Sequence, residues 1–467
     1  MSRDRMPQCL RALASLAVTG LVATAAAAIA APLHLPQATR FTLKNGLPVI
    51  VVPTARLPLV DLRLVVRAGA VDDPAGKEGL AHLTASLLTQ GAGPRDAGRV
   101  ADDIAFVGGS LAADAGPEQT IVTCEVLEKD FAVGLELFRD CVVSPAFATD
   151  EFERKRAETI GGIASAKDDP DSLADVELLP FLLGQSPLAH PAVGWESSLA
   201  RITRDDVAAF HARTFRPERA LLAVVGDVEP QAVRAALETA FAAWNPESEK
   251  RVEHAAADAP DMRGRRVRII DRPEVTQSQI RIACLGVPRN HPDYFPIVVA
   301  NAILGASFTS RLVNEIRVNQ GLTYWILSRF HMLRDSGMFT ITTFTRNEML
   351  RRTIDGTLAE VKKLLDQGPT PEELERAKRY LTGQFPLGLQ APDALAARLV
   401  DVEFYRLDPA FLASYGDRVA AVTMEDCRRA LKSYVCTDDL RILVVSNAAA
   451  ASKQLEGLGP VEVKQPR

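Results

Sequence analysis

Few side chains in this 467-residue sequence stand at spacings that support a known chemistry. The seven histidines show none of the separations at which one helix or turn holds a metal ion. They are His34, His82, His190, His211, His254, His291 and His331. A G-x-S-x-G elbow, a P-loop and a C-x-x-C pair are also absent from the sequence. By themselves, the residues therefore do not indicate serine-hydrolase, nucleotide-phosphate or dithiol redox chemistry.

The composition is that of a folded globular protein. Hydrophobic residues make up 47% of the chain and charged residues 24%, and the mean hydropathy is +0.02. The formal net charge of −5 argues against a cationic nucleic-acid surface. The length is enough for two or more domains, each with its own core. Nucleic-acid binding and a multi-span membrane bundle are therefore excluded as functional classes.

The N-terminus has the pattern of an export signal. Three arginines fall within the first eleven residues, and the uncharged, alanine-rich segment 12–31 follows them. Residues 28–30, Ala-Ile-Ala, form a small-x-small cleavage pattern. We therefore expect residues 1–31 to be a cleaved signal peptide and the mature protein to be periplasmic or secreted. The alternative is a retained membrane anchor, because twenty uncharged residues are long enough to span a bilayer.

An internal repeat organises the rest of the chain. Residues 202–227 align with residues 422–447, each with a threonine N-cap, an acid in the first helical turn and a buried strand after the helix. Upstream, residues 60–70 and 277–287 both have the pattern of a strand that leads into a helix. The repeat predicts two homologous halves of about 215 residues each.

Composition places the domain boundaries. The segment 246–264 is polar and charged, as an exposed linker is. We therefore predict an N-terminal domain over 32–245 and a C-terminal domain over 265–467. Residues 41–53 contain an Asn-Gly hairpin turn, and residues 370–384 begin with a threonine cap and continue as a helix. The expected fold is α+β: two homologous α/β halves, with strands at the ends of each half and long helices packed on the sheet.

Five cysteines remain once the predicted signal peptide is removed. They are Cys124, Cys141, Cys284, Cys427 and Cys436. An odd number leaves at least one thiol free or paired between chains. Cys427 and Cys436 are near enough in sequence to bridge, but for most of the five the pattern favours single thiols buried in strands and helices.

The segment 67–92, RAGAVDDPAGKEGLAHLTASLLTQGA, resembles the opening helix region of the insulinase/pitrilysin zinc peptidases, including their mitochondrial-processing-peptidase-like bacterial members. Active members carry H-x-x-E-H on this helix, with two histidines that bind zinc and a glutamate that activates water. Here His82 stands at the first position, Ala85 replaces the glutamate and Ser86 replaces the second histidine.

The family's third zinc ligand is a glutamate farther along the chain, ahead of an acidic turn. Aligning that turn on Asp168-Asp169-Pro170 places Gly162 at the ligand position. One ligand of three does not hold a catalytic zinc. The resemblance therefore implies that this chain binds no metal and that His82 is kept for packing or capping.

The family also implies a place for substrate. Gly108 and Gly109 precede an alternating, strand-like segment that begins with Ser110, Leu111, Ala112 and Ala113. In the family this edge strand accepts an extended peptide through backbone hydrogen bonds. The alternative is an ordinary edge strand with no ligand.

The second half keeps its own family signature, whereas the first half lacks the zinc motif. Residues 304–330, LGASFTSRLVNEIRVNQGLTYWILSRF, resemble the family segment in which Ser-Arg-Leu leads a helix that ends at Arg-x-x-x-Gly-Leu-x-Tyr. In active members an arginine and a tyrosine of this segment bind the substrate carbonyl and stabilise the oxyanion. These roles carry over to Arg317 and Tyr324. The alternatives are a surface arginine and a core tyrosine.

The resemblance implies a non-catalytic subunit of a heterodimeric zinc peptidase. Its homologous partner would hold the zinc, this chain would supply Arg317 and Tyr324 in trans, and an unfolded peptide would be the substrate. No metallopeptidase activity is expected of this chain alone. Two alternatives remain: a catalytically inert scaffold, and a peptide-binding or chaperone-like protein of the same fold.

Overall fold

The computed structural model describes residues 35–245 and 261–467. The predicted signal peptide and residues 246–260 of the predicted linker lie outside the described residues. Residues 36–467 form one compact unit. Among the described residues, no helix combines the length and apolar character needed to cross a bilayer.

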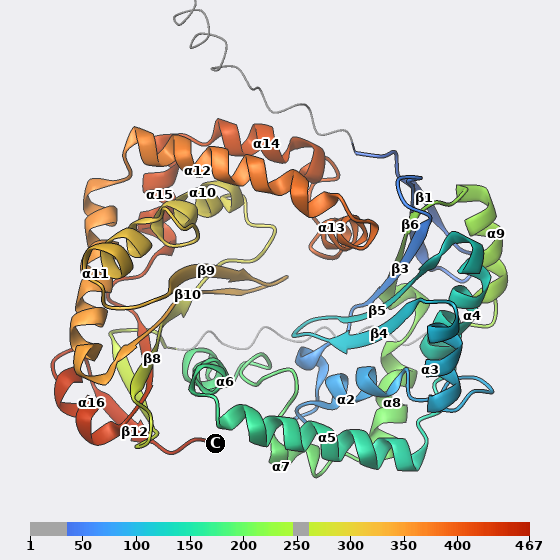
Figure 1. Ribbon diagram of the computed structural model, residues 1–467, viewed down its shortest axis with the longest axis horizontal. Helices are drawn as coiled ribbons and strands as arrows, with labels where there is room; N and C mark the ends of the chain where they lie inside the picture. The colour runs from blue at the N-terminus through green and yellow to red at the C-terminus, as the bar shows by residue number, and fades with distance from the viewer. Residues whose placement is uncertain (1–34, 246–260) are drawn as a thin grey trace, which may run out of the picture. The chain divides into compact units, whose positions relative to one another are not determined.

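The first half contains six strands and a set of covering helices (Figure 1). The strands are β1 (Thr39–Thr42), β2 (Pro48–Pro53), β3 (Leu59–Val66), β4 (Ser110–Ala115), β5 (Thr120–Leu127) and β6 (Ala220–Gly226). The main helices are α2 (Leu80–Leu87), α3 (Ala97–Phe106), α4 (Phe131–Val143), α5 (Thr149–Lys167), α6 (Pro170–Leu183), α7 (Glu196–Leu199), α8 (Arg204–Thr214) and α9 (Pro230–Ala240).

The second half repeats this order of elements. Its strands are β7 (Arg266–Asp271), β8 (Gln277–Leu285), β9 (Ile326–Met332), β10 (Gly337–Arg346), β11 (Arg441–Ser446) and β12 (Val461–Lys464). Its helices are α10 (Tyr294–Leu304), the π-helical turn η5 (Val313–Asn319), α11 (Leu350–Gln367), α12 (Pro371–Gln384), α13 (Pro392–Phe404), α14 (Phe411–Ala421), α15 (Met424–Tyr434) and α16 (Ala448–Leu455).

The two sheets have the same topology, which confirms the predicted α+β fold in two homologous halves. The strand order is β1-β2-β6-β3-β5-β4 in the first sheet and β12-β7-β11-β8-β10-β9 in the second. In both sheets one central pair is parallel, β2 with β6 and β7 with β11, and the strands beyond it are antiparallel. The outer strand differs, because β1 forms a hairpin with β2 whereas β12 runs parallel to β7.

Details of the repeat follow from local sequence. Thr203 and Thr423 each cap a helix, α8 and α15, and each accepts a hydrogen bond from the N–H of the aspartate three residues on. The hairpin between β1 and β2 turns at Gly46, whose φ of 90° lies in the left-handed region that glycine tolerates. Local capping and turn chemistry therefore made these elements predictable.

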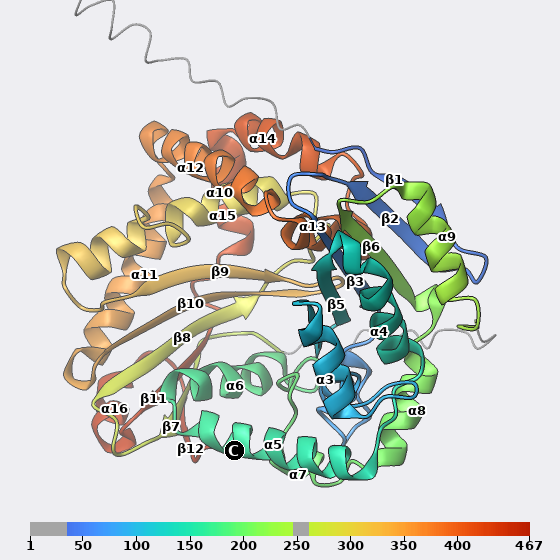
Figure 2. The ribbon, with the colours of Figure 1, turned by 45° about the vertical axis from the view of Figure 1, so that its right-hand side comes forward.

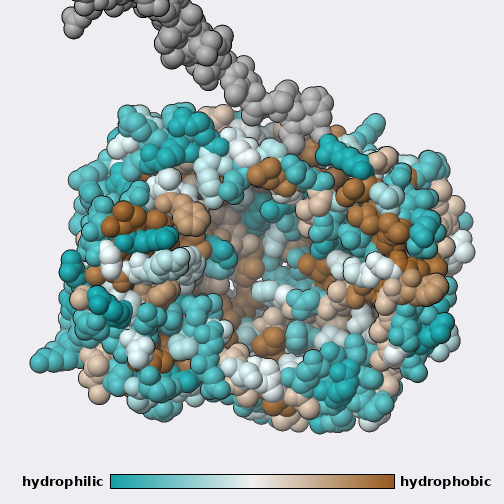
Figure 3. Space-filling model, viewed as in Figure 1, coloured by the Kyte–Doolittle hydropathy of each residue, from teal (hydrophilic) through white to brown (hydrophobic). Residues whose placement is uncertain are grey.

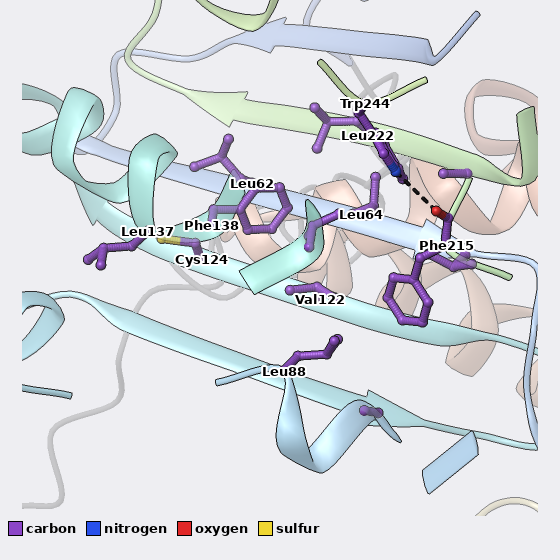
Figure 4. Packing of buried hydrophobic residues seen from close by; sticks show 14 of the residues in the cluster. Leu62, Leu64, Leu88, Val122, Cys124, Leu137, Phe138, Phe215, Leu222 and Trp244 are labelled. Atoms are coloured by element: carbon purple, nitrogen blue, oxygen red, sulfur yellow. Dashed lines mark hydrogen bonds between the residues drawn. The ribbon is translucent and has the colours of Figure 1, made fainter. Parts of the chain in front are cut away.

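The core of the first half lies between one face of its sheet and helices α2, α4 and α8. Leu62, Leu64 and Val122 point from the sheet toward Phe138 of α4, and all four are completely buried (Figure 4). At the edge of this core the indole N–H of Trp244 donates to the carbonyl of Phe215 over 3.0 Å. The alternating apolar residues of β3 and β5 supply one wall of this core.

The other face of each sheet is covered by a helix from the opposite half. Helix α6 packs on β8 and β11, whereas α13 packs on β3 and β6 (Figures 1 and 2). The two helices begin with matching sequences, PDSLA at 170–174 and PDALA at 392–396. The exchange is therefore reciprocal and follows the internal repeat.

Cys427 and Cys436 do not form the disulfide that the sequence left open. Cys436 forms a disulfide with Cys284 of β8, which ties the segment before β11 to the neighbouring strand. Cys124, Cys141 and Cys427 are buried free thiols. Cys427 lies on the buried face of α15, and sequence distance did not reveal that Cys284, 152 residues away from Cys436, is its partner in space.

Candidate functional site

Helix α2 holds the first group of predicted site residues. The carboxylate of Asp73 caps this helix, accepting hydrogen bonds from the backbone N–H groups of Gly79 over 2.7 Å and Ala81 over 2.8 Å. Gly79 has a φ of 98°, and a Cβ there would lie 2.6 Å from the carbonyl oxygen of Val193. Glycine is therefore required where the start of α2 meets the 190–195 loop.

His82 lies on α2 facing the edge strand β4. Its Nδ1 lies 3.5 Å from Oδ1 of Asp114 in β4. The hydrogen bond from His82 lowers the pKa of Asp114 below its ordinary value. Asp114 is largely exposed, so this pair orients His82 and contributes little to stability.

The positions aligned with the zinc ligands share one pocket. His82, Ser86 and Gly162 line a cavity of ≈ 510 Å³ between α2, α5, α6 and the 190–195 loop. Ala85, at the position of the general base, is completely buried in the core of the first half. The structure therefore brings three of the four positions together around an open space.

The residues at this pocket do not fit a zinc ion. Ser86 offers a neutral hydroxyl, Gly162 has no side chain, and His82 is engaged with Asp114. Within residues 35–245 and 261–467, no group of three or more His, Cys, Asp or Glu side chains stands together as a metal site. The chemistry of this donor set gives no basis for metal-activated water.

The predicted peptide-binding strand is an edge strand. Residues Ser110 to Ala113 begin β4, which pairs with β5 on one side and ends the sheet on the other. Helix α2 contacts both β4 and β5, and His82 of α2 lies beside Asp114 of β4, so His82 and the strand border the same region. The placement is compatible with strand addition and equally with an ordinary edge.

Arg317 and Tyr324 lie together in the second half. Arg317 is in η5, and its guanidinium carbon lies 4.8 Å from the centre of the Tyr324 ring. Tyr324 is 75% exposed, so it is not the core tyrosine of the alternative interpretation. A cation stacked on an exposed ring is held in place while its remaining N–H donors stay available.

The loop that carries Tyr324 is anchored to the sheet of the second half. Leu322 and Ile326, on either side of it, are buried. The hydroxyl of Thr345 in β10 donates to the carbonyl of Leu322 over 2.7 Å, and that of Thr343 donates to the carbonyl of Trp325 over 2.8 Å. The backbone is therefore anchored to the sheet while the tyrosine side chain projects into solvent.

A groove of three adjoining cavities links the two groups of residues. The cavity at His82 shares Val176 and Pro191 with a second cavity of ≈ 410 Å³, which in turn shares Trp325 and Leu327 with a third of ≈ 190 Å³ beside Arg317. Figure 3 shows apolar residues in the hollow between the two halves. We call these three cavities the groove; it connects the degenerate metal position to the Arg–Tyr pair.

Sequence reasoning missed several groove residues. Arg281 of β8 is 1% exposed and binds Asp171 over 2.7 Å and Asp175 over 2.6 Å, both on the exchanged helix α6. Glu177 of α6 is also 1% exposed and lines the first cavity. A charge inside an apolar strand or helix pattern signals a buried pair, and this signal was present for both residues.

The chain is thus a duplicated α/β protein with a groove between its halves and a degenerate metal position at one end of that groove. Comparison with family models agrees. Residues 49–190 match the model described as insulinase (peptidase family M16), and residues 201–381 match that described as peptidase M16 inactive domain. The chain belongs to peptidase family M16, as its resemblance to the insulinase/pitrilysin peptidases predicted.

Individual relatives support this assignment. An uncharacterized zinc protease of Mycobacterium leprae is 28% identical over 378 residues, covering 77% of this chain and 81% of the relative. The uncharacterized zinc protease YmxG of Bacillus subtilis is 23% identical over 362 residues, covering 77% and 86%.

Solved structures show the same fold. A peptidase M16 inactive domain from Pseudomonas fluorescens superposes with a TM-score of 0.82 at 28% identity, covering 88% of this chain and 98% of that one. A protease from Helicobacter pylori gives a TM-score of 0.82 at 22% identity, covering 88% and 100%. The resemblance extends over both halves.

Proposed function

We propose that this chain is the non-catalytic subunit of a heterodimeric zinc peptidase. A homologous partner holds the zinc and hydrolyses an unfolded peptide, and this chain supplies Arg317 and Tyr324 to that site in trans. Arg317 donates to the carbonyl oxygen of the substrate and Tyr324 to the developing oxyanion, since both are hydrogen-bond donors positioned before the reaction.

The observation that carries the proposal is the exposed Arg–Tyr pair on a rigid base. A tyrosine that is 75% exposed on a loop anchored by two threonines presents its ring and hydroxyl to a bound chain. Phe308, Val318 and Trp325, near the pair in sequence or beside it in the groove, are also exposed. This apolar surface suits a partner chain or a peptide.

The groove favours a second candidate function, peptide binding without cleavage. Its three cavities and the neighbouring edge strand β4 offer apolar and backbone contacts to an extended chain. A partner is not needed for this function. An inert scaffold would leave the exposed Arg–Tyr pair without a role.

The test is peptide hydrolysis by this chain alone, by a zinc-bearing homologous subunit alone, and by the mixture. Activity in the mixture should fall about 10²–10³-fold with Arg317→Ala or Tyr324→Phe, as for the loss of an oxyanion donor, while the complex still assembles. Arg346→Ala is the matched control, because this exposed arginine pairs with Glu348 at the end of β10. Unchanged turnover in the Arg317 and Tyr324 variants contradicts the proposal.

We also propose a periplasmic or secreted location. The N-terminal pattern supports export, and the Cys284–Cys436 disulfide suits an oxidising compartment. Fractionation of cells producing the full chain, with mass determination of the mature N-terminus, tests this location and the removal of the predicted signal peptide together.

A further inference from the structure

The first cavity of the groove contains a buried carboxylate. Glu177 projects from α6 among Leu173, Val176 and other apolar lining residues and is 1% exposed. A carboxylate in such surroundings loses most of its hydration, so it requires a cation or hydrogen-bond donors in compensation. What Glu177 contacts therefore indicates what the cavity is built to hold.

Glu177 contacts Arg467, at the far end of the sequence. The backbone N–H of Arg467 donates to Oε1 of Glu177 over 2.8 Å, and the Arg467 Nε lies 3.7 Å from Oε2. The Arg467 guanidinium also lies 5.8 Å from the ring centre of Trp195, on another wall of the cavity. Glu177 therefore contacts both the backbone N–H and the charged side chain of Arg467, and Trp195 lies near its planar guanidinium group.

The other charges at the cavity are already compensated. Lys155 lies 3.2 Å from Glu158, and Lys167 lies 2.9 Å from Glu196. Within the part of the chain that the structure describes, Arg467 is the cation that pairs with Glu177. The carboxylate and Trp195 therefore form an acidic and aromatic receptor for a single basic residue.

We propose that this cavity is a binding site for an arginine-containing peptide segment, and that residues 465–467 occupy it in cis. The segment leaves β12 at Lys464 and reaches α6 three residues later. The self-docked arginine lies in the same cavity as His82, Ser86 and Gly162, so it limits access to the degenerate metal position. The proposal concerns this chain by itself and does not depend on a partner subunit.

The experiment measures binding of a fluorescent, amidated Val-Lys-Gln-Pro-Arg peptide, a copy of residues 463–467, to the full-length chain. The Arg467→Ala variant should bind this probe about tenfold more tightly than the unchanged chain, because the competing internal arginine is gone. Adding Glu177→Gln to that variant should remove the gain. A probe that ends in alanine should bind weakly to every variant.

Glu158→Gln in the Arg467→Ala background is the matched control, since Glu158 lines the same cavity but is paired with Lys155. It should leave probe binding unchanged. Equal binding by the unchanged and Arg467→Ala chains overturns the proposal, as does the absence of saturable binding to Arg467→Ala. If Glu177→Gln does not fold, equal affinity for the arginine and alanine probes still overturns it.

Discussion

The two halves of the molecule share one architecture but have kept different parts of it. Five strands of each sheet occupy equivalent places, and helices α8 and α15 begin with the same threonine cap. The catalytic positions do not match in this way. The first half has a pocket in which two of the three zinc-ligand positions, Ser86 and Gly162, carry no metal-binding side chain. The second half has the anchored Arg–Tyr pair.

This difference distinguishes the residues that the fold requires from those that only the chemistry requires. Apolar alternation, caps and the exchanged helices are required in both halves, because each sheet has two faces to cover. The metal position is required only where a metal is used. At the positions that align with the family's metal site this chain has Ala85, Ser86 and Gly162, yet the pocket around Ser86 and Gly162 is still formed.

The largest expected effect comes from rebuilding the lost ligands. The double variant Ser86→His/Gly162→Glu places three potential ligands, with His82, around one cavity. We expect it to bind zinc at least about a thousandfold more tightly than the unchanged chain. Metal content after dialysis and zinc titration measure the effect.

The single variant Ser86→His is the control, because two ligands bind zinc weakly. Peptide hydrolysis should not return in the double variant, since Ala85 still stands where the general base is needed. A folded double variant without zinc affinity would mean that these positions no longer converge on one metal.

A smaller effect is expected at a buried position where the halves differ. Asp61 of β3 and Gln279 of β8 occupy equivalent places, opposite Val225 and Val445. Asp61 is 1% exposed, its Oδ1 has no hydrogen-bond partner among the described residues, and burial raises its pKa to about 7. Arg63 opposes this shift, whereas Asp393 and Glu125 add to it.

Asp61→Gln copies the second half and should remove a pH-dependent penalty of about 4 kcal/mol at pH 8, because the pKa of Asp61 is raised to about 7. The sign follows from the raised pKa. Asp61 is neutral in both the folded and the unfolded chain below about pH 4, and its penalty grows as pH rises from there to about 7. Urea unfolding at pH 8 and pH 4 measures the difference, and an equal gain at both pH values would contradict the assignment.

The smallest expected effect is on stability, and it should be the same in the two halves. Thr203→Ala and Thr423→Ala each remove the side chain that caps an equivalent helix, and each should cost about 1 kcal/mol. Thermal unfolding of the two variants compares them directly. Costs that differ by more than about 1 kcal/mol would show that the repeat is conserved in sequence but not in energetics.

The sequence predicted what depends on local patterns. The caps at Thr203 and Thr423, the hairpin at Gly46 and the alternating strands follow from neighbouring residues. The family motifs supplied Arg317 and the positions around His82 as candidates, and their roles stay predictions. Contacts between distant segments were not predictable in this way. The Cys284–Cys436 bridge, the Arg281 ion pairs and the exchange of α6 and α13 depend on how the halves meet.

The exchange of helices also has a consequence for biosynthesis. A ribosome makes the chain from its N-terminus, and β3 and β6 are complete by residue 226. Their outer face is covered by α13, which ends at Phe404. A nascent chain therefore carries an unfinished first sheet until nearly the whole protein has been made, and for that interval it offers holdase chaperones a sheet face that the finished protein covers.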